Sequence, residues 1–332
     1  MHGMHGMQDM QDIQDIQDIQ ETQDTQGIQD IQDIKDMQDM RSTKDRTDRT
    51  EKTDRTEKIY SPAKVNLLLK VLSRRPDGYH NLVSLVDLIS LADTLSIEEL
   101  DDDSILVEDD KGVLPKGPAN TMYKAAMLLK EAYAVKKGVH VFVEKNIPIG
   151  AGLGGPSSNA ATLLKALVRL WSLPVGPQEL MNIGVRVGAD VPLFLHGKSC
   201  IMRGIGEQIE PIQLPELWYV IVYPGIVLHT RDVYEGLKIP LTLAQNDITF
   251  SAQLSTAFDI ARTMENDLEE AAFSLCPQIQ TVKERLREAG AIGSLMSGSG
   301  SSVFGVFQNE ASAELASGKV RDLGNVFTAH SV

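Results

Sequence analysis

The stretch Ile147–Thr162 reads IPIGAGLGGPSSNAAT and places four glycines and two serines directly in front of a helical pattern. Glycine adopts positive φ angles without strain and lets main-chain N–H groups approach a ligand closely. The helix that follows offers unpaired N–H groups and a partial positive charge at its first turn. The pattern is therefore typical of a phosphate-binding loop, although a flexible turn that ends in a helix cap has the same composition.

Two common phosphate-binding motifs do not match this loop. A Walker loop ends in GK[ST], and this ending is absent here. The dinucleotide-binding fingerprint requires a βαβ unit with an acidic residue at a fixed distance, and the sequence has no such unit here. A phosphate bound by this loop would be held by main-chain N–H groups and by the hydroxyls of Ser157 and Ser158.

Outward from the loop, the sequence alternates between strand and helix patterns. The alternating segment 138–147 predicts a strand before the loop, and the segment 157–173 predicts the helix after it. Helices are also expected over 120–135, with Asn120 as the N-cap, and over 176–188.

The segments that flank these helices predict strands. The segment 58–72 has a strand pattern that Pro62 is expected to break, and 82–100 reads as one or two strands with a turn near Ala92–Asp93. The segment 199–212 reads as a pair of strands around a glycine turn.

The last third of the chain combines one buried strand with helices and a hairpin. The apolar segment 217–225 predicts a strand that opens a second domain, and 291–307 predicts two strands around a glycine turn. Helical patterns cover 251–273, 276–290 and 309–323. This mixed order with several hairpins favours an α+β fold with mainly antiparallel sheets over a doubly wound sheet.

Composition narrows the class of protein. The chain has 332 residues with 42% hydrophobic content, and its two cysteines exclude a disulfide framework and a cysteine metal site. No apolar run approaches the ~20 residues of a membrane span, and an acidic, Gln-rich N-terminus does not match a secretory or transit signal. The net charge of −14 argues against a nucleic-acid partner. We therefore expect a cytoplasmic protein with no membrane and no nucleic-acid partner.

The first 58 residues form a low-complexity tail. Gln recurs at every third position from Gln8 to Gln38, with Lys35 as the exception, and a three-residue period continues from Asp45. Fifteen acidic and eight basic residues give this tail a net charge of −7, half of the total. A three-residue period forms no constant apolar stripe on a helix, so we expect a disordered tail without a catalytic role; the alternative is a partner-binding tail.

Three further motifs accompany the glycine loop: SPAKVNLLLKVLSRRPDGYHNLVSL at 61–85, GADVPLFLHG at 188–197 and MSGSGSSVFGVF at 296–307. Together and in this order they resemble the GHMP kinases, which phosphorylate small-molecule hydroxyls with ATP. Within this superfamily, PAKVNLLLKV, RPDGYHNL and GADVPLFL are similar to the 4-diphosphocytidyl-2-C-methyl-D-erythritol kinases of non-mevalonate isoprenoid biosynthesis. The resemblance extends from about Ile59 to the C-terminus.

The resemblance implies an α+β, two-domain GHMP kinase fold with mainly antiparallel sheets. Residues 59–212 would form an N-terminal ribosomal-protein-like α/β domain that binds ATP, and residues 213–332 a C-terminal ferredoxin-like α/β domain. The implied cofactors are ATP and Mg²⁺, and the implied partner is a small-molecule substrate, the cytidine diphosphate ester of methylerythritol. A monomer or a weak homodimer is expected.

The resemblance also implies two catalytic residues. Asp190 would act as the general base that takes the proton of the substrate hydroxyl; otherwise it is an N-cap or turn residue before Pro192. Lys64 would lie beside it, keep the carboxylate ionised and stabilise negative charge in the transition state; otherwise it is a lysine that reaches out from a sheet edge. Asn66, two residues further along a strand, would share the face of Lys64 and contact the substrate or the pair.

The remaining site residues divide between nucleotide and substrate. Tyr79 and His80 would hold the cytosine ring, the first by stacking and the second by a hydrogen bond. Thr230 would line the substrate side, as would Asn266 and Asp267. Asn120 and Lys145 would approach the base of ATP. The ATP phosphates would be wrapped by Pro148, Ile149, Gly150, Ala151, Gly152, Leu153, Gly154, Gly155, Pro156, Ser157 and Ser158. A third loop consists of Ser297, Gly298, Ser299 and Gly300. It would close over the phosphate and substrate region; the alternative is a simple hairpin turn.

Two features depart from the family pattern. Pro156 stands where the family loop has a glycine, so one N–H group is missing from the loop. The substitution is tolerated at the first turn of a helix but would weaken ATP binding if that N–H group contacts phosphate. The tail has no counterpart in the family. No acidic cluster indicates a Mg²⁺ site, so ATP phosphates and water are expected to hold most of that ion.

Two other functions are compatible with these motifs. One is a different GHMP kinase, of the homoserine or mevalonate type, although the Tyr79–His80 turn favours a cytidine-containing substrate. The other is a nucleotide-binding relative without catalysis, which the presence of both Lys64 and Asp190 disfavours.

Overall fold

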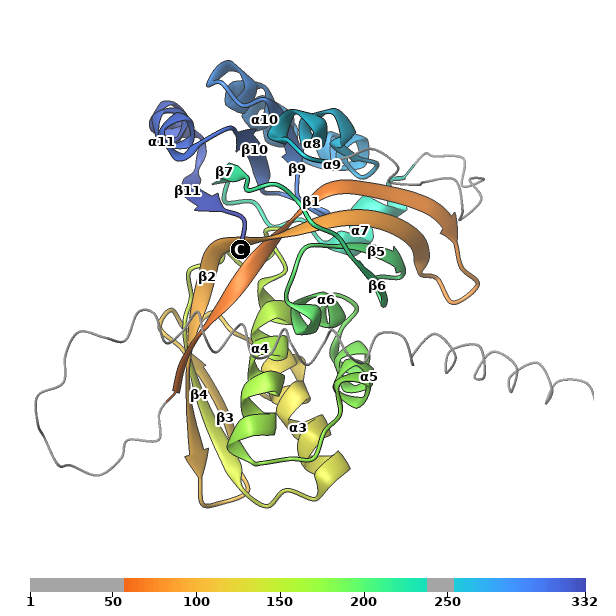
Figure 1. Cartoon of the computed structure of the whole chain (residues 1–332), viewed down its shortest axis with the longest axis vertical. Helices are drawn as coiled ribbons and strands as arrows, with labels where there is room; N and C mark the ends of the chain where they lie inside the picture. The colour runs from red at the N-terminus through yellow and green to blue at the C-terminus, as the bar shows by residue number, and fades with distance from the viewer. Residues whose placement is uncertain (1–56, 238–253) are drawn as a thin grey trace, which may run out of the picture. The chain divides into compact units, whose positions relative to one another are not determined.

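The computed structural model describes residues 57–237 and 254–332, as Figure 1 shows in colour. The chain divides into two units, Met1–Asp54 and Arg55–Val332, and the second unit carries all the described elements. The predicted disordered tail lies outside the described residues except for Glu57 and Lys58, which begin the first strand.

A seven-stranded sheet forms the first half of this unit. Its strand order is β3-β4-β2-β1-β8, and β5 pairs with β2 and with β6. Four of its six strand pairings are antiparallel, whereas β3–β4 and β1–β8 are parallel. The bounds are β1 Glu57–Arg74, β2 His80–Leu100, β3 Ile105–Asp109, β4 Gly138–Glu144, β5 Cys200–Gly204, β6 Gln208–Pro211 and β8 Glu265–Asn266.

The two long strands β1 and β2 differ from the prediction. Pro62 does not break β1; the strand continues through it with a register shift between Pro62 and Ala63, the kind of irregularity at which a sheet tolerates proline. The predicted turn near Ala92–Asp93 is wrong as well, because β2 is continuous. Asp93 is fully buried, where it accepts hydrogen bonds from the main-chain N–H groups of Asn146 and Ile147.

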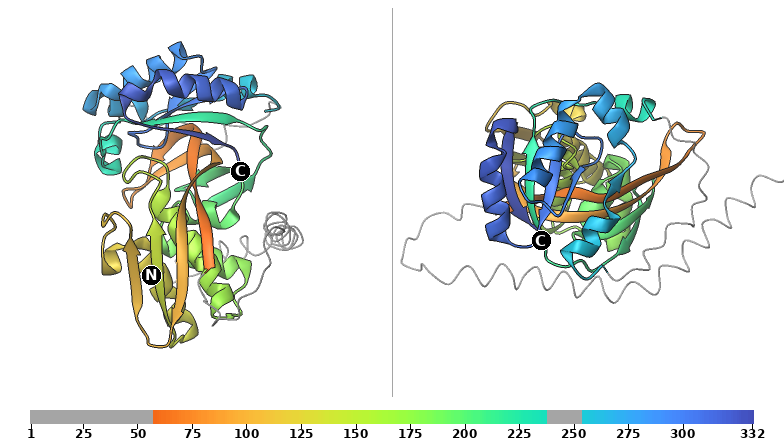
Figure 2. Two further views of the ribbon diagram at one scale, coloured as in Figure 1. Left: turned by 90° about the vertical axis from the view of Figure 1, so that its left-hand side faces the viewer. Right: turned by 90° about the horizontal axis from the view of Figure 1, so that it is seen from above.

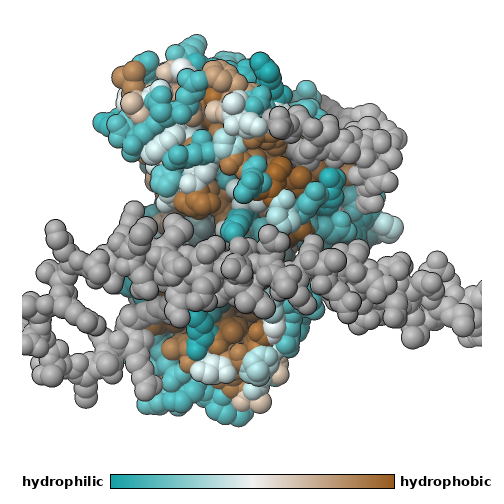
Figure 3. All heavy atoms as spheres, viewed as in Figure 1, coloured by the Kyte–Doolittle hydropathy of each residue, from teal (hydrophilic) through white to brown (hydrophobic). Residues whose placement is uncertain are grey.

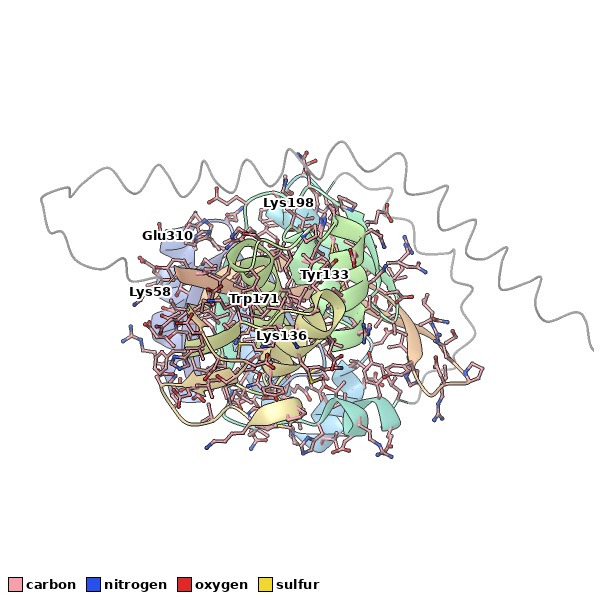
Figure 4. The ribbon with its side chains drawn as sticks, turned by 90° about the horizontal axis from the view of Figure 1, so that it is seen from below. Lys58, Tyr133, Lys136, Trp171, Lys198 and Glu310 are labelled. Atoms are coloured by element: carbon pink, nitrogen blue, oxygen red, sulfur yellow. The ribbon has the colours of Figure 1, made fainter. Side chains whose placement is uncertain are left out.

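Helices cover one face of this sheet (Figure 1). They are α3 Thr121–Tyr133, α4 Gly155–Leu170, α5 Pro177–Val187 and α6 Val191–His196, with the short η1 Gly117–Ala119 before them. Asn120 caps α3 as predicted, since its side chain accepts from the N–H groups of Met122 and Tyr123. Figure 4 labels Tyr133 and Trp171, which stand at the C-terminal ends of α3 and α4.

A second, four-stranded sheet is entirely antiparallel and has the order β11-β7-β10-β9. Its strands are β7 Trp218–Tyr223, β9 Gly293–Met296, β10 Val303–Phe307 and β11 Asn325–His330. Its helices are α7 Thr230–Glu235, α8 Ala257–Thr263, α9 Glu269–Leu275, α10 Gln278–Glu288 and α11 Glu310–Lys319, with η2 Arg321–Leu323 before β11. Figure 2 shows α10 and α11 on the outer side of this sheet.

Two differences from the prediction lie in this half. The described part of the expected helix 251–273 is two short helices, α8 and α9, separated by the two-residue strand β8 that pairs with β1. The last helix does not end the fold, because β11 follows it and pairs with β7 along six residues. The sequence NVFTAH is too short and mixed to show this strand by periodicity.

The four layers are joined by three apolar cores. One lies between the first sheet and α3 to α6, one between the two sheets, and one between the second sheet and its helices. Strand β7 shows the principle: Tyr219 and Ile221 join the core between the sheets, whereas Val220 and Val222 join the outer core. Buried faces on both sides explain why this strand is apolar throughout.

The outer surface of the helical layer is mixed. In Figure 3, hydrophilic residues are interspersed with isolated hydrophobic ones over α10 and α11. Among the described residues, no helix is both long enough and apolar enough to cross a bilayer. Cys200 and Cys276 are both buried and unpaired with each other.

A buried carboxylate links the two sheets. Asp87 of β2 is fully buried and accepts hydrogen bonds from the hydroxyls of Ser199, Tyr219 and Ser331. Burial raises the pKa of Asp87 above its usual 3.8, and the four hydrogen bonds, including one from the N–H group of Leu88, oppose that increase.

This raised pKa predicts a pH dependence of stability. The folded protein holds the Asp87 proton more tightly than the unfolded chain, so the contribution is fully present below pH 3.8 and is lost as the pH rises through the folded-state pKa. Denaturant unfolding should be measured from about pH 4 to about pH 8. As the pH rises, the free energy of unfolding of Asp87→Asn should increase relative to that of the wild type. Asp259→Asn is the flat control: the Thr256 hydroxyl lowers the pKa of Asp259 below its usual 3.8, so the contribution of this carboxylate changes little above about pH 5. Parallel pH curves for Asp87→Asn and the wild type would contradict the prediction.

Candidate active site

A cavity of about 1160 Å³ opens between the first sheet, α7 and two glycine-containing loops. Lys64 and Asn66 of β1 line it, together with Asp190. The predicted residues that also line it are Tyr79, His80, Gly150, Gly152, Gly154, Thr230, Gly298, Ser299 and Gly300. The structure therefore places residues from all four sequence motifs around one space.

In the glycine loop, carbonyl oxygens are used in hydrogen bonds within the protein, whereas several N–H groups are not. Its carbonyl oxygens are occupied: that of Ala151 accepts from the N–H of Ser302, that of Gly152 from the Lys64 ammonium, and that of Leu153 from the N–H of Lys64. Within the described part of the chain, the N–H groups of residues 152–155 donate to no other residue. Four free donors on a loop that lines the cavity make a site for an anion.

The start of α4 completes this site. Gly154 is its N-cap with a φ of 75°. The first turn of α4 contains Pro156, which is exposed to solvent. Because the N–H groups of a first turn have no partner within the helix, proline costs no helix hydrogen bond there. The Pro156 carbonyl accepts a hydrogen bond of 2.8 Å from the Thr121 hydroxyl, which ties α3 to α4.

The third loop rests directly on the glycine loop. The Ser297 hydroxyl donates to the Gly152 carbonyl over 3.0 Å, and a Cβ atom on Gly152 would lie only 2.1 Å from the Ser297 carbonyl oxygen. Asn266 holds the third loop from the other side, because its amide donates to the carbonyls of Met296 and Gly298. Asn266 therefore supports the loop and does not itself line the cavity.

Lys64 is a buried cation that lines the cavity. Its side chain is 5% exposed, and its ammonium donates to Asn66 Oδ1 and, over 2.8 Å, to the Gly152 carbonyl. Lys64 and Asn66 share a face of β1, as the strand alternation predicts, while Ala63, Val65 and Leu67 pack into the core on the other face. Burial lowers the pKa of Lys64, and the charge of Asp190 opposes that shift.

Asp190 is available for chemistry because the helix does not use it. It stands at the N-cap of α6, but its side chain makes no capping hydrogen bond. Its charge reaches two neighbouring groups: the pKa of Tyr234 and that of Cys200 are each raised to about 12, first by burial and then by Asp190. The carboxylate thus faces a cavity bordered by Lys64 on one side and Tyr234 on another.

Aromatic side chains also line the cavity. The rings of His80 and Tyr234 lie 5.0 Å apart at 31°, and Tyr79 is 59% exposed on the turn between β1 and β2. Burial lowers the pKa of His80, and the nearby Arg74 lowers it further, so the neutral imidazole is favoured. Tyr234 was missed by the sequence analysis, because its short helix α7 carries no recognisable motif.

Thr230 and Ser299 meet across the cavity, with their hydroxyl oxygens 2.9 Å apart. Asp267 lies elsewhere and pairs with Lys70 over 3.0 Å. Eight further predicted residues of these two loops do not line the cavity: Pro148, Ile149, Ala151, Leu153, Gly155, Pro156, Ser157 and Ser297. Their loops surround the site, and their individual roles stay predictions.

Three other predicted residues do not line the cavity, and their side chains instead form hydrogen bonds or ion pairs within the protein. Asn120 caps α3, and the buried Ser158 hydroxyl bonds to the Pro62 carbonyl. The Lys145 ammonium is 2.7 Å from the buried Asp93 carboxylate and also donates to the Ile147 carbonyl. Asp93 and Lys145 therefore fix the start of the glycine loop, and contact of Lys145 or Asn120 with nucleotide stays a prediction. The sequence signal for Asp93 was an acid inside an apolar strand.

The described residues contain no group of three or more His, Cys, Asp or Glu side chains arranged to hold a metal ion. Three carboxylates line the cavity, Asp77, Asp190 and Glu235, and the charge of Asp190 acts on Lys64. A divalent cation here would depend mainly on phosphate oxygens and water, as Mg²⁺ commonly does.

Comparison with known proteins agrees with this architecture. The family model of the GHMP kinases N terminal domain matches residues 120–198, and that of the GHMP kinases C terminal domain matches residues 254–326. A solved 4-(cytidine 5'-diphospho)-2C-methyl-D-erythritol kinase has a TM-score of 0.72 at 38% identity, covering 82% of this chain and 98% of its own. A homoserine kinase from Cytophaga hutchinsonii shares the fold, with a TM-score of 0.65 at 20% identity over 86% of this chain and 97% of its own.

Curated relatives narrow the family. The 4-diphosphocytidyl-2-C-methyl-D-erythritol kinase of Syntrophotalea carbinolica is 40% identical over 78% of this chain and 92% of its own length. The enzyme of the same name from Geobacter metallireducens is 41% identical over 80% of this chain and 95% of its own length. With this similarity extending over the unit that contains the cavity, the chain belongs to the 4-diphosphocytidyl-2-C-methyl-D-erythritol kinase family of the GHMP kinases.

Proposed function

We propose that this protein transfers the γ-phosphoryl group of ATP to the 2-hydroxyl of 4-diphosphocytidyl-2-C-methyl-D-erythritol. One observation carries the proposal: a single cavity joins a loop of free N–H groups, a Lys64–Asp190 pair and an aromatic cluster. The loop suits phosphate, the pair suits proton removal beside negative charge, and the aromatic cluster suits a pyrimidine ring.

In this proposal ATP supplies the phosphoryl group and ADP is the leaving group. The N–H groups of residues 152–155 hold the phosphates. Asp190 accepts the hydroxyl proton as the substrate oxygen forms its bond to the γ-phosphorus and the bond to the β,γ-bridging oxygen breaks. Lys64 stabilises the negative charge on the transferred group. Phosphoryl transfer depends mainly on such positioning and electrostatics, so this small set of groups is sufficient.

Mg²⁺ would neutralise charge on the phosphates. Since no acidic cluster is present among the described residues, Asp190 is the side chain of the cavity best placed to contribute an oxygen, directly or through water. The other oxygens would come from ATP and solvent.

Substrate selection would rest on the aromatic end of the cavity. The neutral His80 ring can both donate and accept a hydrogen bond, and it lies next to Tyr234, while Tyr79 stands exposed beside it. A cytosine ring placed among these side chains would put its diphosphate ester toward Lys64 and the two loops. We also propose domain limits of 59–212 and 213–332. The oligomeric state stays a prediction, a monomer or a weak homodimer. The absence of nucleic-acid and membrane partners and the location in the cytoplasm also stay predictions.

An ADP-release assay with a panel of alcohols tests the substrate. We expect turnover with the cytidine diphosphate ester of methylerythritol and at least about a hundredfold lower kcat/KM with homoserine or mevalonate, since those molecules leave the aromatic groups unused. A preference for homoserine or mevalonate would assign another GHMP kinase activity. If the protein binds ATP but releases no ADP with any alcohol of the panel, it would be a nucleotide-binding member of the family without catalytic activity.

A further inference from the structure

A chain of three hydrogen bonds connects the Lys64 ammonium to the main chain of β1. Lys64 donates to Asn66 Oδ1, Asn66 Nδ2 donates to the Ser84 hydroxyl over 2.8 Å, and that hydroxyl donates to the Leu68 carbonyl over 2.6 Å. Ser84 lies opposite Leu69 in the register of β1 and β2, and it is 1% exposed. The chain is therefore enclosed by the sheet and ends at the floor of the cavity.

The direction of each bond in this chain is fixed by the groups at its two ends. A carbonyl can only accept, so the single hydroxyl proton of Ser84 is used on Leu68, and the Ser84 oxygen must accept from Asn66. An ammonium can only donate, so the amide atom that faces Lys64 must be the oxygen. Both ends require the same orientation of the Asn66 amide, which removes the usual ambiguity between its oxygen and nitrogen.

We propose that Ser84 is a positioning residue for phosphoryl transfer: its hydroxyl locks the Asn66 amide with the oxygen toward Lys64 and so holds the ammonium in the cavity. The proposal rests on the proposed function for the role of Lys64 in catalysis. Without the hydroxyl, the buried Nδ2 group would lose its acceptor, and the amide would be free to turn its nitrogen toward the ammonium.

The other groups around Lys64 would not replace this restraint. Asp190 faces it from the segment before α6, and the Gly152 carbonyl faces it from the glycine loop. Gly298 approaches it from the third loop, with no titratable side chain. His80 and Tyr234 line the same cavity from β2 and α7. Because burial already lowers the pKa of Lys64, loss of an accepting oxygen should lower that pKa further.

Three variants test the proposal. For Ser84→Ala we expect kcat to fall about tenfold or more, the range of a hydrogen bond to a charged group, with KM values within about twofold. The alkaline limb of the kcat–pH profile should move to lower pH, and the melting temperature should fall by only a few degrees, the cost of leaving the buried Asn66 Nδ2 group without its acceptor. Ser84→Thr keeps the hydroxyl and should retain the wild-type rate and profile. Ser294→Ala is the matched control, because Ser294 is 2% exposed in β9 and its hydroxyl has no hydrogen-bond partner among residues 57–237 and 254–332.

The results separate the proposal from the function on which it rests. NMR titration of the Lys64 side chain in the full-length protein needs no substrate, and it should show a lower pKa in Ser84→Ala than in the wild type. An unchanged Lys64 titration, a Ser84→Ala rate within about twofold of wild type, or a Ser84→Thr variant as slow as Ser84→Ala would each overturn the positioning role. If the wild-type protein releases no ADP from ATP in the presence of the proposed substrate, the proposed function is overturned. The Lys64 titration result would still stand in that case.

Discussion

Asp190→Asn is expected to lower kcat by about 10²- to 10⁴-fold, the usual contribution of a positioned general base. The amide keeps the size of the carboxylate but cannot take the hydroxyl proton. Folding should be unaffected, because the Asp190 side chain makes no capping hydrogen bond to α6. KM values for ATP and substrate should change much less than kcat, since the loss falls on the transition state. Steady-state ADP release at saturating substrates measures the effect.

The matched control for this variant is Asp322→Asn. Asp322 lies in η2, where its exposed carboxylate pairs with Arg285 over 3.1 Å, and it is not among the residues that line the cavity. Its loss removes one surface ion pair, which is worth at most about 1 kcal/mol and should leave turnover unchanged. An Asp190→Asn enzyme as fast as the wild type would show that another group removes the proton.

Gly152→Ala is expected to abolish turnover by displacing both loops of the phosphate site. Gly152 has a φ of 77°, where a side chain is strained, and its Cβ would lie 2.1 Å from the Ser297 carbonyl and 2.9 Å from that of Gly300. Main-chain atoms cannot rotate away as a flexible side chain can, so the third loop must move. Strain at such a position costs of order 1–3 kcal/mol, in addition to the displaced contacts.

The measurements for Gly152→Ala are ATP affinity by calorimetry, turnover and thermal melting. We expect ATP binding to weaken at least about tenfold, because the change displaces the N–H groups of residues 152–155. Gly318→Ala is the control: Gly318 lies in α11, nothing stands within 4 Å of its Cβ position, and alanine favours a helix by up to about 1 kcal/mol. Normal ATP binding by Gly152→Ala would show that this loop does not hold the phosphates.

The parts of the site that the sequence predicted depend on local chemistry. Glycines before an amphipathic helix specify the loop and the start of α4, whatever the rest of the fold does. Strand alternation is likewise enough to place Asn66 beside Lys64. The loop motif at Ser297 could be recognised for the same reason, since Gly298 and Gly300 alternate with serines within a few residues.

The parts that could not be predicted depend on contacts between distant segments. Tyr234 meets His80 only because α7 folds over the end of the β1–β2 hairpin. The strand continuity at Asp93 depends on Lys145, Asn146 and Ile147, which follow β4 and satisfy a buried carboxylate that the local sequence alone places in a turn. Strand β8 is two residues long, so periodicity cannot show it.

The central claim is that Lys64, Asp190 and the glycine loop together move a phosphoryl group onto a substrate alcohol. The most direct measurement is the phosphorus NMR spectrum of the products formed by the wild-type protein from ATP and the cytidine diphosphate ester of methylerythritol. We predict a new phosphate monoester on the 2-hydroxyl in equal amount to ADP. ADP accompanied only by inorganic phosphate, or an ester at another hydroxyl, would contradict the claim.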